Sequence, residues 1–176
     1  MEVCVDSVAG LVAATQGGAD RIELCAALGI GGLTPPESLI RAAAAGTLPV
    51  HLLCRPREGD FIASTAERAL VADDIRLAAE AGLAGVVIGA SEADRRLNQA
   101  TLAERIAHAC TCGTDRTAAD AQRPSLRPVF DLVEALEQAV AVGLNRMLTS
   151  EGPMQAIDGA APLIVLHHKP PATSPS

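Results

Sequence analysis

Short apolar segments alternate with longer alanine-rich segments along most of the chain. The short segments have the length and composition of buried strands, which we predict at Glu2–Val5, Arg21–Cys25, Val50–Cys54, Gly85–Gly89, Leu126–Phe130 and Arg146–Thr149. The alanine-rich segments predict helices at Ser7–Gln16, Pro36–Ala45, Thr65–Ala81, Gln99–Ala109, Leu132–Ala141 and near Pro153–Ala156. This alternation is typical of parallel βα units.

Residues at the ends of the predicted helices fit this pattern. Ser7 can cap the first helix, Pro36 suits the first turn of the second, and Gly82 and Gly143 are placed to end later ones. The polar stretch Gly113–Pro124 has the composition of a loop. Six βα units in series favour an α/β fold, either a TIM (β/α) barrel or a doubly wound sheet. The sequence has no G-x-G-x-x-G loop, which removes the main support for a dinucleotide-binding doubly wound sheet.

The number of predicted strands is small for a barrel. A TIM barrel has eight strands and ~250 residues, whereas this chain has 176 residues and six predicted strands. We therefore predict an incomplete barrel, with about six of eight βα units, over residues 1–160. Residues 161–176 end in a Pro, Ser and Thr string and are expected to form a disordered tail outside it. Unpaired edge strands predict a homo-oligomer or an aggregation-prone chain.

The alternation of side chains within the strands predicts a polar inner face. In the string GGADRIELC, Ile22 and Leu24 are expected to face the helices, so that Glu23 and Cys25 point towards the barrel axis. The same period directs Glu2, Cys4 and Asp6 inward from the first strand, and His51 and Arg55 from the third. Because a buried carboxylate is costly without a partner, we expect these acids to pair with His51, Arg55 or Arg57. A purely structural salt-bridge network is one interpretation of this cluster.

Composition excludes several classes of function. The chain carries 14 Lys and Arg against 21 Asp and Glu, a net charge of -7, which disfavours nucleic acid as a partner. The start MEVCVDSVAG has no basic region, and no 18-residue apolar stretch follows, so we expect a cytoplasmic protein without a membrane partner. Five cysteines without a C-x-x-C pair argue against a disulfide framework. Cys110 and Cys112 form a C-x-C that could hold a soft metal, although ordinary thiols are the simpler interpretation.

Several short strings together resemble those of the CutC copper homeostasis family. They are MEVCVDS, GGADRIELCAAL, GGLTP, PVH, RPREGDF, DIRLAAEAGLAGVVIGA and LTS, in the family's order and at similar spacing. The resemblance implies a TIM barrel, a cytoplasmic setting and an association with copper tolerance. The chain departs from the family's pattern at Ile30, where an acid is usual, and at Arg127, where an inward histidine is usual.

The resemblance also implies a set of site residues. Cys4 and Cys25, inward on neighbouring strands, would form a two-coordinate site for Cu(I), a soft ion that prefers sulfur. The alternative is a barrel enzyme acting on a small anionic substrate, with the catalytic group Glu23, Arg55, Arg57 and Asp60. In that enzyme the arginines would clamp the anion and Glu23 would move a proton. A remnant without activity is the third interpretation.

Overall fold

The sheet consists of parallel strands that pair in the order of the sequence. In the computed structural model, which describes residues 1–94, 96–113, 115–119, 132–144 and 146–148, the strands are β1 (Glu2–Val5), β2 (Arg21–Leu24), β3 (Val50–Leu53), β4 (Gly85–Ile88), β5 (Asp115–Ala119) and β6 (Arg146–Leu148). Each strand pairs in parallel with the next one along the chain. This sequential parallel order is the arrangement of a (β/α) barrel and confirms the predicted fold class.

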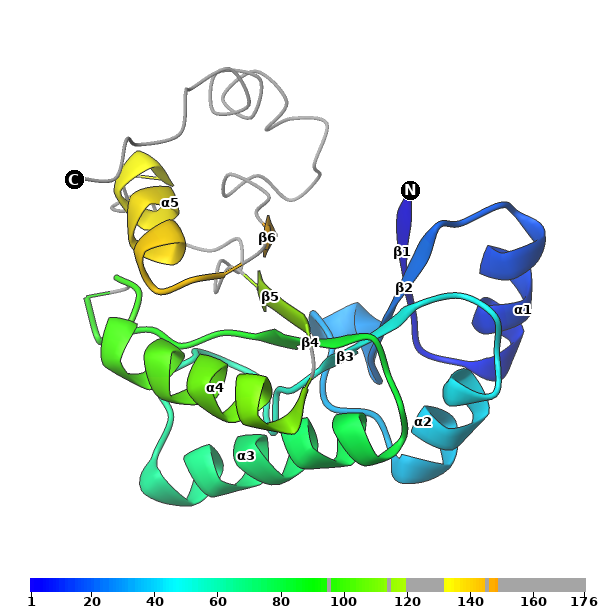
Figure 1. The fold of residues 1–176 in the computed structure, drawn as a ribbon, viewed down its shortest axis with the longest axis horizontal. Coiled ribbons are helices and arrows are strands. Elements are labelled where there is room, and N and C mark those ends of the chain that lie inside the picture. Colours follow the sequence, from blue (N-terminus) through cyan, green and yellow to red (C-terminus); the bar gives the residue numbers. More distant parts are fainter. Residues whose placement is uncertain (95, 114, 120–131, 145, 149–176) are drawn as a thin grey trace.

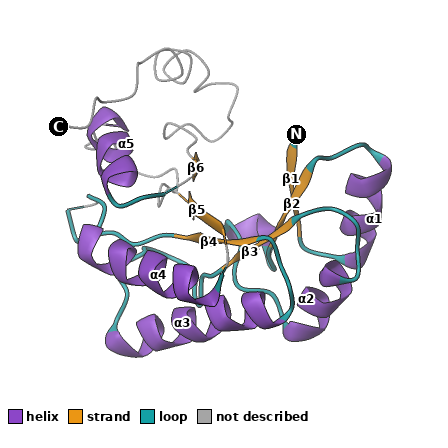
Figure 2. Cartoon of the chain, in the orientation of Figure 1, coloured by secondary structure: helices purple, strands orange, loops and turns teal. Residues whose placement is uncertain are grey.

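The helices lie on the outer side of this curved sheet. They are α1 (Val8–Gln16), α2 (Glu37–Ala44), α3 (Thr65–Glu80), α4 (Gln99–Cys112) and α5 (Leu132–Ala141), with a short 3-10 turn at Leu28–Ile30. Figure 1 shows α1 to α4 following the outside of the sheet, with β1 and β6 at its two ends. Figure 2 shows the same alternation of strand and helix along the chain. The described strands therefore form an arc rather than a closed barrel. The expected boundary near residue 160 lies outside the described residues.

The main hydrophobic core fills the space between the sheet and the helices. Ile22 and Leu24 of β2 are 1% and 0% exposed and belong to the same cluster as Ile40, Ile75 and other residues of the helices. The predicted outward direction of these two strand residues is therefore confirmed. On the other face of the sheet, Cys25, Leu53 and Val87 form a second, much smaller apolar cluster.

Local signals fix the helix starts and ends close to their predicted positions. The Ser7 hydroxyl accepts a hydrogen bond from the Gly10 N–H at 3.1 Å and caps α1 as predicted. Pro36 lies one residue outside the predicted first turn of α2: its extended ψ of 149° makes it the residue before the helix. Gly82 and Gly143 adopt positive φ just after α3 and α5, as predicted.

The fifth strand is the main error of the sequence prediction. The polar stretch after α4 was expected to be a loop, but β5 occupies Asp115–Ala119 and pairs with β4 over four residues. Gly113, at φ 79°, ends α4 in the left-handed conformation and returns the chain at once to the sheet. A strand can form there without an apolar sequence because its neighbour β4 supplies the backbone hydrogen bonds. The strand predicted at Leu126–Phe130 and the helix near Pro153–Ala156 lie outside the described residues.

A glycine allows one loop to close over the inner face. Gly32 follows β2 at φ 82°, and a Cβ atom there would lie 2.6 Å from Leu53 Cδ2 and 3.2 Å from Cys25 Cβ. Only glycine permits both this backbone conformation and this close approach. The GGLTP loop therefore packs directly on the small inner apolar cluster.

None of the helices in the described part of the chain has the length and apolar character needed to cross a bilayer.

Candidate functional site

Two thiols and a carboxylate meet on the inner face of β1 and β2. Cys4 is in register with Glu23, and its thiol donates to Glu23 Oε2 at 3.4 Å. Cys25 follows β2: its N–H donates to the Val5 carbonyl at 3.0 Å, and its thiol lies 3.6 Å from the same oxygen. The structure therefore brings together three residues that the strand period predicted to face inward. We call Cys4, Glu23 and Cys25 the thiol–carboxylate cluster.

Both thiols of this cluster are held in their protonated form. Partial desolvation, followed by the negative charge of Glu23, raises the pKa of Cys4 to about 12, although the residue retains an exposed surface. Desolvation, then Glu23 and then Asp6, raises the pKa of Cys25 to about 11. Burial also raises the pKa of Glu23, against the hydrogen bond from Cys4. The field around the two sulfur atoms is therefore negative, and it opposes a thiolate that has no cation beside it.

The acids near the cluster have other partners than those expected. Glu2 forms an ion pair with Arg21, its register partner on β2, and the Asp6 carboxylate accepts from the Leu28 N–H at 3.4 Å. Within the described residues, the hydrogen bond to the Glu23 carboxylate comes from Cys4. The expectation that His51, Arg55 or Arg57 would pair with these acids is wrong for Glu2, because its register partner Arg21 forms the ion pair. His51 is buried at the register position beside Glu23.

Arg55 lies at the end of β3 and holds two loops together. The residue is 4% exposed, and its Nη1 donates to the carbonyls of Gly31 and Gly32 at 3.2 and 2.9 Å. Its Nη2 donates to the Gly59 carbonyl at 2.8 Å, and the guanidinium lies 4.8 Å from the centre of the Phe61 ring. This geometry combines charged hydrogen bonds with a cation–π contact. Arg55 thus joins the loop after β2 to the RPREGDF loop.

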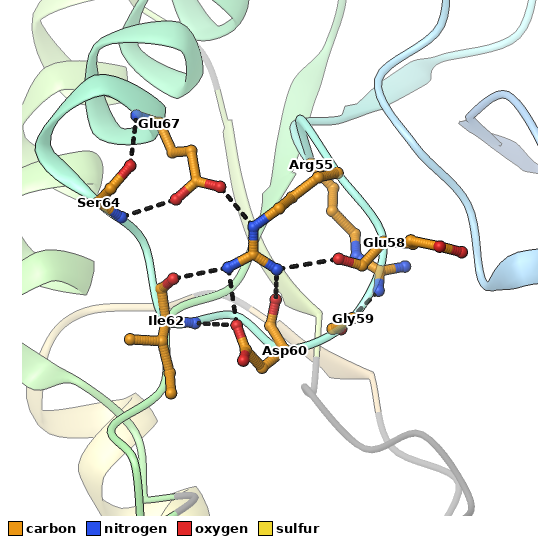
Figure 3. A network of polar contacts seen from close by, with 8 residues as sticks. Arg55, Glu58, Gly59, Asp60, Ile62, Ser64 and Glu67 are labelled. Atoms are coloured by element: carbon orange, nitrogen blue, oxygen red, sulfur yellow. Dashed lines mark hydrogen bonds and ion pairs between the residues drawn. The ribbon is translucent and has the colours of Figure 1, made fainter.

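Arg57 uses all five of its N–H groups within its own loop and α3. Nε donates to Glu67, Nη1 to the carbonyls of Glu58 and Asp60 at 2.9 and 3.2 Å, and Nη2 to Asp60 Oδ1 and the Ile62 carbonyl, both at 2.8 Å. Figure 3 shows these bonds converging on one guanidinium. The hydrogen bond from Arg57 lowers the pKa of Asp60. Because guanidinium has five donors, none of the Arg57 N–H groups remains for an anion.

The predicted catalytic group is therefore divided in space and in role. Glu23 lies with the thiols, whereas Arg55, Arg57 and Asp60 shape the loops at the carboxyl ends of the strands. An anion clamp made by the two arginines would require the RPREGDF loop to open. No group of three or more His, Cys, Asp or Glu residues in the described ranges is arranged to hold a metal ion, so any metal here relies on the two thiols.

The junction between the RPREGDF loop and α3 is expected to be sensitive to acid. Ser64 and Glu67 form a capping box, and hydrogen bonds from Ser64, then from Arg57, lower the pKa of Glu67 from 4.5 to about 2. Because the folded pKa is depressed, this stabilisation is complete above pH 4.5 and is lost as the pH falls towards 2. Urea midpoints of the chain and of Glu67→Gln, measured from pH 6 to pH 2, should differ most at pH 6 and converge near pH 2. A difference that does not change with pH would contradict this prediction.

One buried charge was missed by the sequence reasoning. Arg105 of α4 is 6% exposed and lies in the buried stripe of that helix, between Leu102 and Ala109. The signal was available, because a residue three positions after Leu102 and four before Ala109 shares their helix face. Arginine is rarely buried without a partner, so the sequence alone does not distinguish this position from an exposed one.

Comparison with known proteins places the chain in a family. The sequence model of the CutC family matches residues 1–170. The CutC family protein of Rhizobium meliloti (strain 1021) is 47% identical over 94% of the chain and 66% of its own length. That of Caulobacter vibrioides (strain NA1000 / CB15N) is 42% identical over 94% of the chain and 65% of its own length. The chain thus spans slightly less than two thirds of these relatives.

Solved structures agree on the fold. The CutC protein of Streptococcus agalactiae, a proposed copper homeostasis protein, superposes with a TM-score of 0.82 at 23% identity, over 94% of this chain and 80% of that one. An archaeal fructose 1,6-bisphosphate aldolase superposes with a TM-score of 0.55 at 16% identity, over 88% of this chain and 60% of the aldolase. At these identities the solved structures support the barrel architecture alone. The family assignment rests on the sequence matches, which have higher identity. The chain belongs to the CutC family.

Proposed function

We propose that this chain is a copper homeostasis protein that binds one Cu(I) ion between the thiols of Cys4 and Cys25. The observation that carries the proposal is the pair of thiols, on neighbouring strands, in a field made negative by Glu23 and Asp6. The copper homeostasis role proposed for the Streptococcus agalactiae relative supports the same function.

The chemistry of the cluster suits a soft monovalent cation. Thiolates and thioethers select Cu(I) over hard cations, which prefer carboxylate and water. Coordination replaces two S–H bonds by two Cu–S bonds and releases two protons to solvent. The positive charge of the copper ion attracts both sulfur atoms and offsets part of the negative field that opposes a lone thiolate. Cys4 retains an exposed surface through which copper could enter, whereas Cys25 is 1% exposed.

A competition titration tests this proposal. Reduced protein, titrated anaerobically with Cu(I) against a chromogenic chelator, should bind one ion per chain. Cys4→Ser and Cys25→Ser should each weaken binding at least about 100-fold, because a two-coordinate site loses half its sulfur ligands. Cys110→Ser, at an exposed position on α4, is the matched control and should bind like the parent.

The pH dependence of the same titration adds a second readout. Because the pKa values of about 11 and about 12 keep both thiols protonated near neutrality, copper must displace two protons. The affinity should rise about 100-fold per pH unit between pH 6 and 8. Undiminished binding by the Cys4→Ser, Cys25→Ser double variant would contradict the proposal.

The alternative of a barrel enzyme acting on a small anion has less support. Every N–H group of Arg57 is bonded within the RPREGDF loop and α3. Arg55 donates to the Gly32 and Gly59 carbonyls and thereby joins two loops. Glu23 keeps one property of an acid–base group, a raised pKa in a buried setting. The same titration separates copper binding from the third interpretation, a remnant without activity, which predicts no saturable site.

We also propose that the chain self-associates through the edge of its sheet. In the described part of the chain β1 pairs with β2 alone, so its other edge presents unpaired backbone groups. A second copy is the occupant whose strands have matching length and direction. This proposal concerns the partial barrel and its edge, and it is independent of copper.

A further inference from the structure

A small cavity lies between the RPREGDF loop, α3 and the end of β4. Its volume is about 20 Å³, and its lining includes Cys54, Arg57, Phe61, Val71, Gly89 and Arg105. A space of this size admits one particle the size of a water molecule, since a water needs about 10–15 Å³ by this measure. The cavity is separate from the thiol–carboxylate cluster, because none of Cys4, Glu23 and Cys25 lines it.

Arg105 brings a buried positive charge to this cavity without a matching acid. Its Nη1 donates to the Gly89 carbonyl, and its buried Nε has no hydrogen-bond partner among the described residues. The ion pairs of the described residues include none for Arg105: nearby Glu67 pairs with Arg57, and Glu104 pairs with Arg68. A buried guanidinium without a counter-ion is strongly unfavourable. Burial accordingly lowers the pKa of Arg105.

The charges and walls of the cavity decide what would fill it. Three arginines (Arg55, Arg57 and Arg105) line it against two acids (Asp60 and Glu67), and Arg57 bonds to both of those acids. The remaining excess charge is positive. Phe61 and Val71 supply apolar walls, which favour a large, weakly hydrated ion over a strongly hydrated one and strengthen its attraction to the guanidinium.

We propose that this cavity binds a single chloride ion beside the guanidinium of Arg105. The ion supplies the missing counter-charge and accepts a hydrogen bond from the unpartnered Nε. It ties α4 to the RPREGDF loop, which faces the same cavity. The site is thus an anion-dependent brace for the loop at the carboxyl ends of β3 and β4.

Thermal unfolding at constant ionic strength tests the proposal. Replacing sodium gluconate by sodium chloride should raise Tm in a saturable way, by about 2–4 °C once chloride exceeds its dissociation constant several-fold. Gluconate is a bulky, strongly hydrated anion, so it serves as the reference. Arg105→Met should abolish the chloride response, whereas Arg41→Met, at an exposed arginine of α2, should retain it.

A measurement on the unaltered chain covers the case in which Arg105→Met does not fold. Crystals grown in sodium bromide should show an anomalous scattering peak in the cavity next to Arg105. A Tm that responds equally to chloride and gluconate, or a cavity without a bromide peak, would show that water fills the space and would overturn the proposal. Because none of these readouts involves copper, their failure leaves the proposed copper site unaffected.

Discussion

Arg55→Met is expected to lower the free energy of unfolding by about 3 kcal/mol, because one buried and two part-buried hydrogen bonds from a charged donor are lost at once. The substitution removes the hydrogen bonds to Gly31, Gly32 and Gly59 and the contact with Phe61. Methionine keeps much of the side-chain volume, so the loss reports the polar contacts rather than a cavity. The two loops that Arg55 joins should also become more accessible to protease.

Two further variants serve as comparisons for the loss of stability in Arg55→Met. Arg55→Lys keeps the charge but not the planar fork, so it should recover only part of the stability. Arg41→Met removes an exposed i,i+4 ion pair on α2 and should change stability by less than about 0.5 kcal/mol. Urea unfolding followed by circular dichroism provides the comparison. An Arg55→Met chain as stable as the Arg41→Met control would contradict the role assigned to Arg55.

The 176-residue chain is expected to elute as a dimer or a larger species, or to be insoluble. Among the described strands, β1 has no partner on its outer edge, which offers backbone donors and acceptors, and an open arc is expected to leave apolar surface on its inner face uncovered. At ~25 cal/mol per Å², a few hundred Å² of exposed apolar surface approaches the whole stability of a domain. Size-exclusion chromatography with light scattering measures the outcome directly.

A chain extended at its C-terminus is the matched comparison for this prediction. About a third of the Rhizobium meliloti relative lies outside the matched stretch, and the part of it that follows this stretch can be fused to the present sequence. The fusion should be monomeric and should unfold cooperatively at a higher temperature. A stable monomer of the 176-residue chain, unfolding no lower than the fusion, would mean that the edge of the sheet is covered in another way.

The sequence predicts the first four strands well because their side chains obey a strict period. β1 has the predicted bounds, and β2, β3 and β4 each end one residue earlier than predicted. Each of these strands alternates or runs apolar against a helix, and α1, α3 and α4 each begin at a residue whose side chain caps the helix. β5 is not predicted from the sequence, because its residues, DRTAA, have no apolar pattern. Its position depends on pairing with β4, which is a tertiary effect that local propensity does not report.

The strand period predicts which side of the sheet the site residues face, but not which groups they bond to. Period two correctly placed Cys4, Glu23 and Cys25 on one side of the sheet. It could not show that Arg57 forms ion pairs with Glu67 and Asp60, because these pairs depend on the path of the RPREGDF loop. Nor could it show which carbonyls Arg55 would reach. Loop geometry therefore gives Arg55, Arg57 and Asp60 structural partners of their own, while Glu23 lies with the two thiols.

The central claim is that sulfur atoms of two neighbouring strands bind Cu(I), and X-ray absorption at the copper K-edge tests it most directly. Protein loaded with one equivalent of Cu(I) should show a first shell of two sulfur atoms and no nitrogen or oxygen. Cys4→Ser and Cys25→Ser should each lose this signature, whereas Cys110→Ser should retain it. A first shell of nitrogen or oxygen, or a two-sulfur shell that persists in the Cys4→Ser, Cys25→Ser double variant, would contradict the account.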